Sequence, residues 1–341
     1  MEEKLSSLLT PYDTVSIIGM SKNAGKTTVL NRLIAEYGKC GIKIGLTSIG
    51  RDGENVDVVT STDKPEIFVT EGTLIATAAD LLKKSDITKE IMQTTGINTP
   101  MGEVVFVRAR SDGYVQIGGG SINSQVAWIC GEFRALGAEK VLIDGAVSRK
   151  TVSSPGVADA AILCTGASLS TDMDRVVEDT AFAAELLMLK PLTDGHIDSL
   201  IEGCPENAGK TAAILANGEV MSLNTEEPLS AGSNIAYIYI RGAVSDRVID
   251  KLIMSNINLK NVSIIVDDGS KLFLKQPILE KLKRSGSGII VRQRINLIAL
   301  AINPVSAYGF NFDKDNFMEV MRKRVAIPVF NVLEEEGKAI S

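Results

Sequence analysis

The stretch Thr14–Ile34, TVSIIGMSKNAGKTTVLNRLI, decides the fold of this chain. Its first six residues form an apolar run that predicts a buried strand. A short loop ending in Gly-Lys-Thr follows, and apolar side chains then recur at i, i+3, i+4 and i+7, which predicts a helix over 27–37. Strand, loop and helix in this order bring the loop N–H groups and the helix N-terminus to one point, where they bind an anion.

The loop itself supplies the predicted phosphate contacts. We expect the nucleotide-binding residues to be Lys22, Asn23, Ala24, Gly25, Lys26, Thr27 and Thr28. Gly25 lets the chain approach the phosphate closely, Lys26 reaches the β- and γ-phosphates, and the Thr27 hydroxyl is a Mg²⁺ ligand. The usual pattern G-x-x-x-x-G-K-[ST] would place a glycine at position 20, where this chain has Met20. Either the loop starts at Gly19 and is one residue longer, or Met20 occupies the first position.

Two carboxylates are candidates for work beside the phosphates. Asp144 follows the apolar run 141–143 in EKVLIDGA, which is typical of a strand-end carboxylate that holds Mg²⁺. Asp52 follows the strand predicted over 42–48 and would ligate the metal or orient the attacking water, with Glu54 as second choice. The alternatives are a turn cap for Asp144 and a plain surface turn for Asp52. The predicted catalytic residues are Lys26 and Asp52, and the predicted metal ligands are Thr27, Asp144 and Asp52.

Strand-like and helix-like patterns alternate along the chain, which predicts an α/β protein with a mainly parallel sheet. A length of 341 residues is natural for two domains. The pattern restarts after a stretch rich in Gly, Asn, Pro and acidic residues. We therefore expect a P-loop domain over 1–190, a linker over 191–233, and a smaller α/β domain over 234–341 that is a candidate for partner binding.

Three local motifs carry further expectations. Asp112-Gly113 separates two β-rich runs in 103–120, which predicts a hairpin at an antiparallel edge of the first domain. The triglycine 118–120 precedes a predicted helix and is either an anion site or a flexible turn. The NAGKT sequence of the loop recurs at 207–211, but no apolar strand leads into it and 212–216 reads as a strand. Lys210 is therefore predicted not to bind phosphate, although the sequence around it repeats that of the loop.

Composition excludes several classes of function. The formal net charge of −6 argues against a general nucleic-acid binder. No apolar run approaches the ~18 residues of a membrane helix, and the acidic N-terminus does not resemble a signal peptide, so we expect a cytoplasmic protein. The single histidine, His196, excludes a multi-histidine metal site and is expected at the surface.

The segment Lys22–Thr28 resembles the P-loops of the SIMIBI class, and within it those of the molybdenum-cofactor nucleotide-binding accessory proteins. The resemblance implies ATP or GTP with Mg²⁺, and either an assembly factor or, less often, a dethiobiotin-synthetase-like enzyme. Lys22 stands four residues before Lys26, whereas the deviant Walker group has its signature lysine five before, so a role across a dimer is not matched. The whole chain, including INPVSAYGF at 302–310, also resembles accessory proteins of cobalamin-dependent amino-acid aminomutases.

These observations predict a Mg²⁺-dependent ATPase with slow basal turnover that matures or reactivates a partner enzyme. The alternatives are a small-molecule kinase or dethiobiotin-synthetase-like ligase, and a binding module that senses nucleotide without turnover. ATP and GTP are both left open as the nucleotide, and so is a homodimer.

Overall fold

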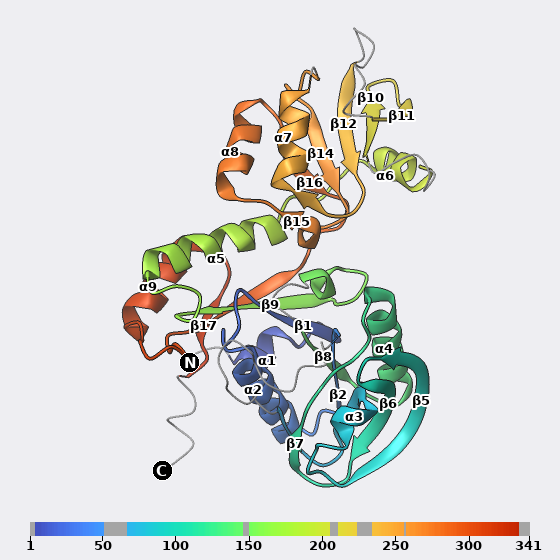
Figure 1. Ribbon diagram of the computed structural model, residues 1–341, viewed down its shortest axis with the longest axis vertical. Helices are drawn as coiled ribbons and strands as arrows, with labels where there is room; N and C mark the ends of the chain where they lie inside the picture. The colour runs from blue at the N-terminus through green and yellow to red at the C-terminus, as the bar shows by residue number, and fades with distance from the viewer. Residues whose placement is uncertain are drawn as a thin grey trace. The chain divides into compact units, whose positions relative to one another are not determined.

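The computed structural model describes residues 4–50, 67–145, 150–204, 211–223, 234–255 and 257–333 (Figure 1). The chain divides into two compact units. The first comprises Met1–Ala181 together with Asn296–Ser341, and the second comprises Phe182–Ile295. Both units are α/β, so the predicted class is confirmed.

A nine-stranded sheet is the centre of the first unit. Its order is β18-β17-β9-β1-β8-β2-β4-β6-β5. The strands from β18 to β4 run parallel to one another, and β6 runs antiparallel to both of its neighbours, β4 and β5. The strands are β1 (Thr14–Gly19), β2 (Ile44–Ser48), β4 (Leu74–Ala78), β5 (Lys89–Thr99), β6 (Gly102–Ala109), β8 (Lys140–Asp144), β9 (Ala160–Gly166), β17 (Leu297–Asn303) and β18 (Val329–Asn331). A small ribbon, β3 (Ile67–Val69) with β7 (Gly113–Val115), lies outside this sheet.

Helices cover both faces of the large sheet. The helices of the first unit are α1 (Leu5–Leu8), α2 (Lys26–Lys39), α3 (Ala79–Leu82), α4 (Asn123–Ala135), α9 (Lys314–Arg324), the single-turn η1 (Lys150–Ser153), and α5 (Met173–Leu187), which continues into the second unit. The apolar face of α2 joins the core cluster that contains Ile44 and Leu46. Phe133 of α4 lies instead over Gly45. Because neighbouring residues of a strand point to opposite faces, α2 and α4 cover opposite sides of β2.

The second unit has a smaller sheet of order β11-β10-β12-β14-β16. Strands β12, β14 and β16 are parallel to one another, and β10 runs antiparallel to both of its neighbours, β12 and β11. Its elements are α6 (Gly195–Glu202), β10 (Thr211–Leu215), β11 (Val220–Ser222), β12 (Ile235–Ile240), β13 (Val244–Ser245), α7 (Asp246–Met254), β14 (Ser263–Val266), η2 (Gly269–Lys271), β15 (Leu272–Phe273), α8 (Gln276–Arg284) and β16 (Gly288–Val291). The predicted strand after Lys210 is therefore present as β10.

The domain boundaries differ from those predicted at 190 and 234. Helix α6 and strands β10 and β11 lie within the expected linker and belong to the second unit. Strands β17 and β18, expected in the second domain, belong to the sheet of the first, where β17 pairs with β9 (Figure 1). Apolar strands of this kind look alike whichever parallel sheet they join. The sequence pattern therefore does not show that the chain returns from the second unit to the sheet of the first.

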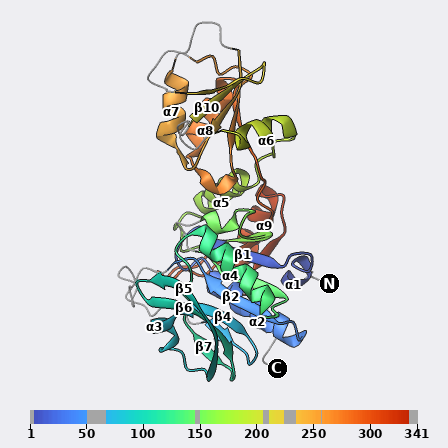
Figure 2. The same cartoon turned by 90° about the vertical axis from the view of Figure 1, so that its right-hand side faces the viewer.

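The hairpin predicted at Asp112-Gly113 is wrong. Strand β6 pairs with β4 and β5, and β7 pairs with β3 instead of β6. The turn is instead bonded to a distant segment, because Asp112 Oδ1 accepts a hydrogen bond from the backbone N–H of Glu71 at 2.8 Å. The expected antiparallel edge is nevertheless present, formed by β6 and β5 next to β4 (Figure 2).

None of the helices within the described ranges is long and apolar enough to cross a membrane.

The contact between β2 and α4 allows a test of the packing. A Cβ atom on Gly45 would lie 2.6 Å from Cγ of Phe133, and both residues are buried. We expect Gly45→Ala to lower the free energy of unfolding by about 1–3 kcal/mol, because overpacking forces the ring or the strand to shift. Gly131→Ala, on an exposed turn of α4 with nothing within 4 Å, should instead raise it by about 0.5–1 kcal/mol. Urea denaturation of both variants measures the difference, and equal effects would contradict the packing described.

Candidate functional site

The chain reverses sharply between β1 and α2. Strand β1 ends at Gly19, and α2 begins at Lys26. In between, Asn23 and Gly25 have positive φ angles of 58° and 92°. This conformation suits glycine and is tolerated by asparagine better than by most residues. The hydrogen bonds of α2 begin where the N–H of Val29 donates to the Gly25 carbonyl, so the preceding N–H groups have no partner within the helix.

Met20 takes the first place of the loop with an ordinary backbone. Its φ is not positive, and its N–H donates to the carbonyl oxygen of Cys164 at 2.8 Å. A glycine is therefore not required there, which favours the second of the two alternatives for the loop. The neighbouring Gly19 has another role, since a Cβ at that position would lie 3.1 Å from both Cδ and Nζ of Lys26. The Lys26 side chain thus folds back over Gly19.

The other predicted phosphate contacts differ in exposure. Thr27 and Thr28 are half-buried in the first turn of α2. Lys22 is exposed, and Ala24 is fully buried in the core cluster under α2. Ala24 can therefore face a ligand only through its backbone, while Thr27 lies beside Lys26 at the start of the helix.

Asp144 lies next to this loop at the edge of the sheet. Strand β8 runs parallel to both β1 and β2, and Asp144 stands opposite Ile17 of β1 and Ser48 of β2. The chain continues close to β1, because the N–H of Gly145 donates to the Ile17 carbonyl at 2.8 Å. The carboxyl ends of parallel strands share one edge, so Asp144 is on the same edge as the loop after Gly19.

The charges of Lys26 and Asp144 both affect the pKa of the buried Cys164 thiol. Cys164 of β9 stands opposite Gly19 of β1, and burial raises the pKa of its thiol to about 12. The charge of Lys26 lowers this pKa and the charge of Asp144 raises it. Lys26 folds over Gly19 of β1 and Asp144 stands opposite Ile17 of the same strand, so both charged residues lie beside the end of β1.

The segment after β2 is only partly described. Asp52, with its neighbours Arg51 and Glu54, lies outside the described residues, as does Lys210. The part before it is tied to the site, since the N–H of Ile49 donates to the Asp144 carbonyl at 3.3 Å.

The triglycine 118–120 is buried beside the end of β2. The N–H of Gly118 donates to Thr77 Oγ1 at 3.0 Å, and that of Gly119 donates to Ser48 Oγ at 3.3 Å. A Cβ on Gly119 would overlap the Ser48 carbonyl. These glycines therefore allow close packing at the end of β2.

Asn303 is a residue of this region that the motif reasoning did not select. It ends β17, and its Nδ2 donates to the carbonyl oxygen of Asn23 in the loop at 3.3 Å. The only signal in the sequence is a polar residue directly after an apolar strand, which many turns share. Its place beside the loop follows from the return of the chain to the first sheet.

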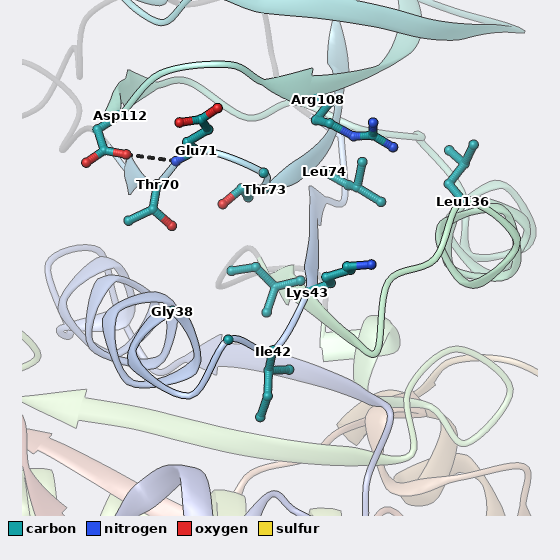
Figure 3. A pocket seen from close by; sticks show the side chains of 13 residues that line it. Gly38, Ile42, Lys43, Thr70, Glu71, Thr73, Leu74, Arg108, Asp112 and Leu136 are labelled. Carbon is teal, nitrogen blue, oxygen red and sulfur yellow. Dashed lines mark hydrogen bonds between the residues drawn. The ribbon is translucent and has the colours of Figure 1, made fainter.

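A cavity of about 560 Å³ lies at the opposite edge of the same sheet, near the end of α2 and the starts of β2 and β4 (Figure 3). Figure 3 shows Glu71 and Asp112 toward one end and Lys43 and Arg108 toward the other. None of the predicted site residues that the structure describes lines it. The cavity is thus separate from the loop after β1.

The described part of the chain contains no cluster of His, Cys, Asp and Glu side chains that could hold a metal unaided. His196 lies exposed in the first turn of α6, as expected. No family model, curated protein or solved structure matches this chain at a significant level.

Proposed function

We propose that the first unit binds a nucleoside triphosphate with Mg²⁺ at the turn between β1 and α2, and hydrolyses it slowly in the service of a partner enzyme. The observation that carries the proposal is the pairing of two features at one sheet edge. Lys26 folds over Gly19 at the start of α2, and Asp144 ends the neighbouring strand β8. A polyphosphate site needs a cation and converging N–H groups beside a carboxylate that can attract a metal.

The phosphates would lie against the first turn of α2. The unpaired N–H groups of a helix N-terminus and the macrodipole both favour an anion there. Lys26 adds a point charge, and the lack of a side chain at Gly19 leaves room for the Lys26 side chain to fold over the loop. Thr27 would contribute its hydroxyl to the metal and Thr28 would add a contact to the phosphates.

Mg²⁺ fits the oxygen donors on offer. It usually keeps several waters and takes one or two carboxylates together with phosphate oxygens, so a complete protein cage is not needed. Thr27 and Asp144 would hold it, with Asp52 as the third candidate. Bound Mg²⁺ would neutralise phosphate charge and favour departure of the γ-phosphoryl group.

The proposed role in maturing or reactivating a partner rests on the resemblance of Lys22–Thr28 to accessory ATPases and on the two-unit build of the chain. A nucleotide-dependent change in one unit can alter the surface that the protein offers to a partner. We take ATP as the nucleotide, with GTP as the alternative.

Lys26→Ala should lower the affinity for ATP by at least about 30-fold, because a charge-assisted contact to a desolvated phosphate contributes about 2–5 kcal/mol. The fold should persist, since the ammonium packs against Gly19 and contributes little to the core. Titration with a fluorescent ATP analogue measures the change. Lys43→Ala, at the opposite sheet edge, and Lys210→Ala, in the repeated NAGKT, are matched controls that should leave affinity unchanged. Equal losses in Lys26→Ala and either control would remove the basis for placing the site at this loop.

Asp144→Asn should weaken the dependence of binding on Mg²⁺ more than binding of the free triphosphate. The amide keeps the shape of the side chain and loses the charge that attracts the metal. Calorimetric titrations of ATP at several Mg²⁺ concentrations measure this for wild type and variant. Superimposable Mg²⁺ curves would assign Asp144 a purely structural role.

The isolated protein should hydrolyse ATP more slowly than about 1 s⁻¹, because switch-type NTPases are slow without a partner and typical enzymes turn over at roughly 1–1000 s⁻¹. Phosphate release measured alone, with candidate metabolites, and with candidate partner enzymes tests this. Fast turnover with a small acid, amine or sugar and no response to any protein would identify a kinase or ligase instead. Binding without turnover under every condition would identify a nucleotide sensor.

A further inference from the structure

We infer that Asn303 is a positioning residue that holds the loop between β1 and α2 in its binding conformation, so that the segment returning from the second unit completes the site. This rests on the proposed function for its consequence in binding, but its structural basis is independent of any ligand. The contacts that carry it come from three separate parts of the chain.

The side-chain amide of Asn303 is held by two neighbours. Its Nδ2 donates to the carbonyl oxygen of Asn23 at 3.3 Å, and its Oδ1 accepts from the N–H of Val305 at 3.1 Å. A carbonyl can only accept and an N–H can only donate, so these two neighbours fix the orientation of the amide. Asn303 therefore presents a donor to the loop and cannot turn it away without losing both bonds.

The backbone of Asn303 is held against β9. The N–H of Ala167 donates to its carbonyl oxygen at 2.9 Å, and β17 pairs with β9 so that Asn303 stands opposite Gly166. A side chain at Gly166 would overlap the Asn303 carbonyl. Glycine at 166 thus permits the close approach that anchors Asn303 to the strand beside β1.

The loop between β1 and α2 needs support at Asn23 and Gly25. Asn23, with φ of 58°, and Gly25, with φ of 92°, hold conformations that are rare for most residues. A Cβ on Gly25 would lie 3.3 Å from Cβ of Asn303 and 3.4 Å from both γ-methyls of Val332. The loop is therefore contacted at Asn23 by a hydrogen bond and at Gly25 by packing, and both contacts come from the returning segment.

A bond of this kind acts on binding through preorganisation. If the loop samples other conformations, only the competent fraction binds, and the apparent affinity falls by that fraction. The effect should be the same for any ligand held by its phosphates, whether or not it carries a nucleoside. It should raise the KM for ATP and leave kcat at saturation unchanged, because ground state and transition state use the loop alike.

The test compares Asn303→Ala with Asn311→Ala. Asn311 lies on the same segment, and its Oδ1 accepts a 3.4 Å bond from the N–H of Ser306 within that segment. Asn303→Ala should weaken binding of both ATP and inorganic tripolyphosphate about tenfold, the loss expected for one hydrogen bond. It should also speed amide hydrogen exchange in the peptide covering 20–28 of the ligand-free protein. Asn311→Ala should do neither.

The outcomes separate the two proposals. Faster exchange of the loop in Asn303→Ala supports the positioning role even if the wild type binds neither ATP nor tripolyphosphate in the presence of Mg²⁺, a result that would instead overturn the proposed function. Unchanged loop exchange, or equal exchange and affinity in the two variants, would overturn the positioning role while wild-type binding keeps the proposed function intact. Weaker ATP binding with unchanged tripolyphosphate binding would also overturn it, because Asn303 would then contact the nucleoside.

Discussion

The turn from β1 into α2 constrains the rest of the first unit. A buried strand and a helix are joined here by a loop with positive φ at Asn23 and Gly25. Such a loop is stable only if its surroundings hold it, because non-glycine residues in this region cost of order 1–3 kcal/mol. The neighbours of β1 meet this need directly: β9 accepts the N–H of Met20, and β17 places Asn303 against Asn23.

The second unit is inserted between two strands that are neighbours in space. Strands β9 and β17 pair along most of their length, yet the whole of Phe182–Ile295 separates them in the chain. Closing such a long loop adds only a slowly growing entropic cost, so the insertion is thermodynamically tolerable. It also means that the loop after β1 is supported by residues that the chain reaches only after passing through the second unit.

The sequence predicted the local parts of this arrangement well. The strand at 14–19, the helix that starts at Lys26 and the strand ending at Asp144 follow from apolar periodicity and glycine placement, which are local signals. It did not predict that 297–303 pairs with β9, because the residues of an apolar strand do not show which sheet the strand joins. The hairpin predicted at Asp112-Gly113 was wrong for a related reason, since β7 pairs with the distant strand β3 and not with β6. Asn303 was missed because its importance arises only from that long-range pairing.

The charge balance limits which form of ligand suits the proposed site. The chain carries a formal net charge of −6, and Asp144 places a carboxylate beside the loop. Against a triphosphate, Lys26 and the α2 N-terminus together supply only about one and a half positive charges. The Asp144 carboxylate would repel a free triphosphate, but it would attract one whose charge is partly neutralised by a divalent cation. The same carboxylate would therefore disfavour the bare anion and favour its metal complex, so that Mg²⁺ would take part in ligand selection as well as in the proposed chemistry.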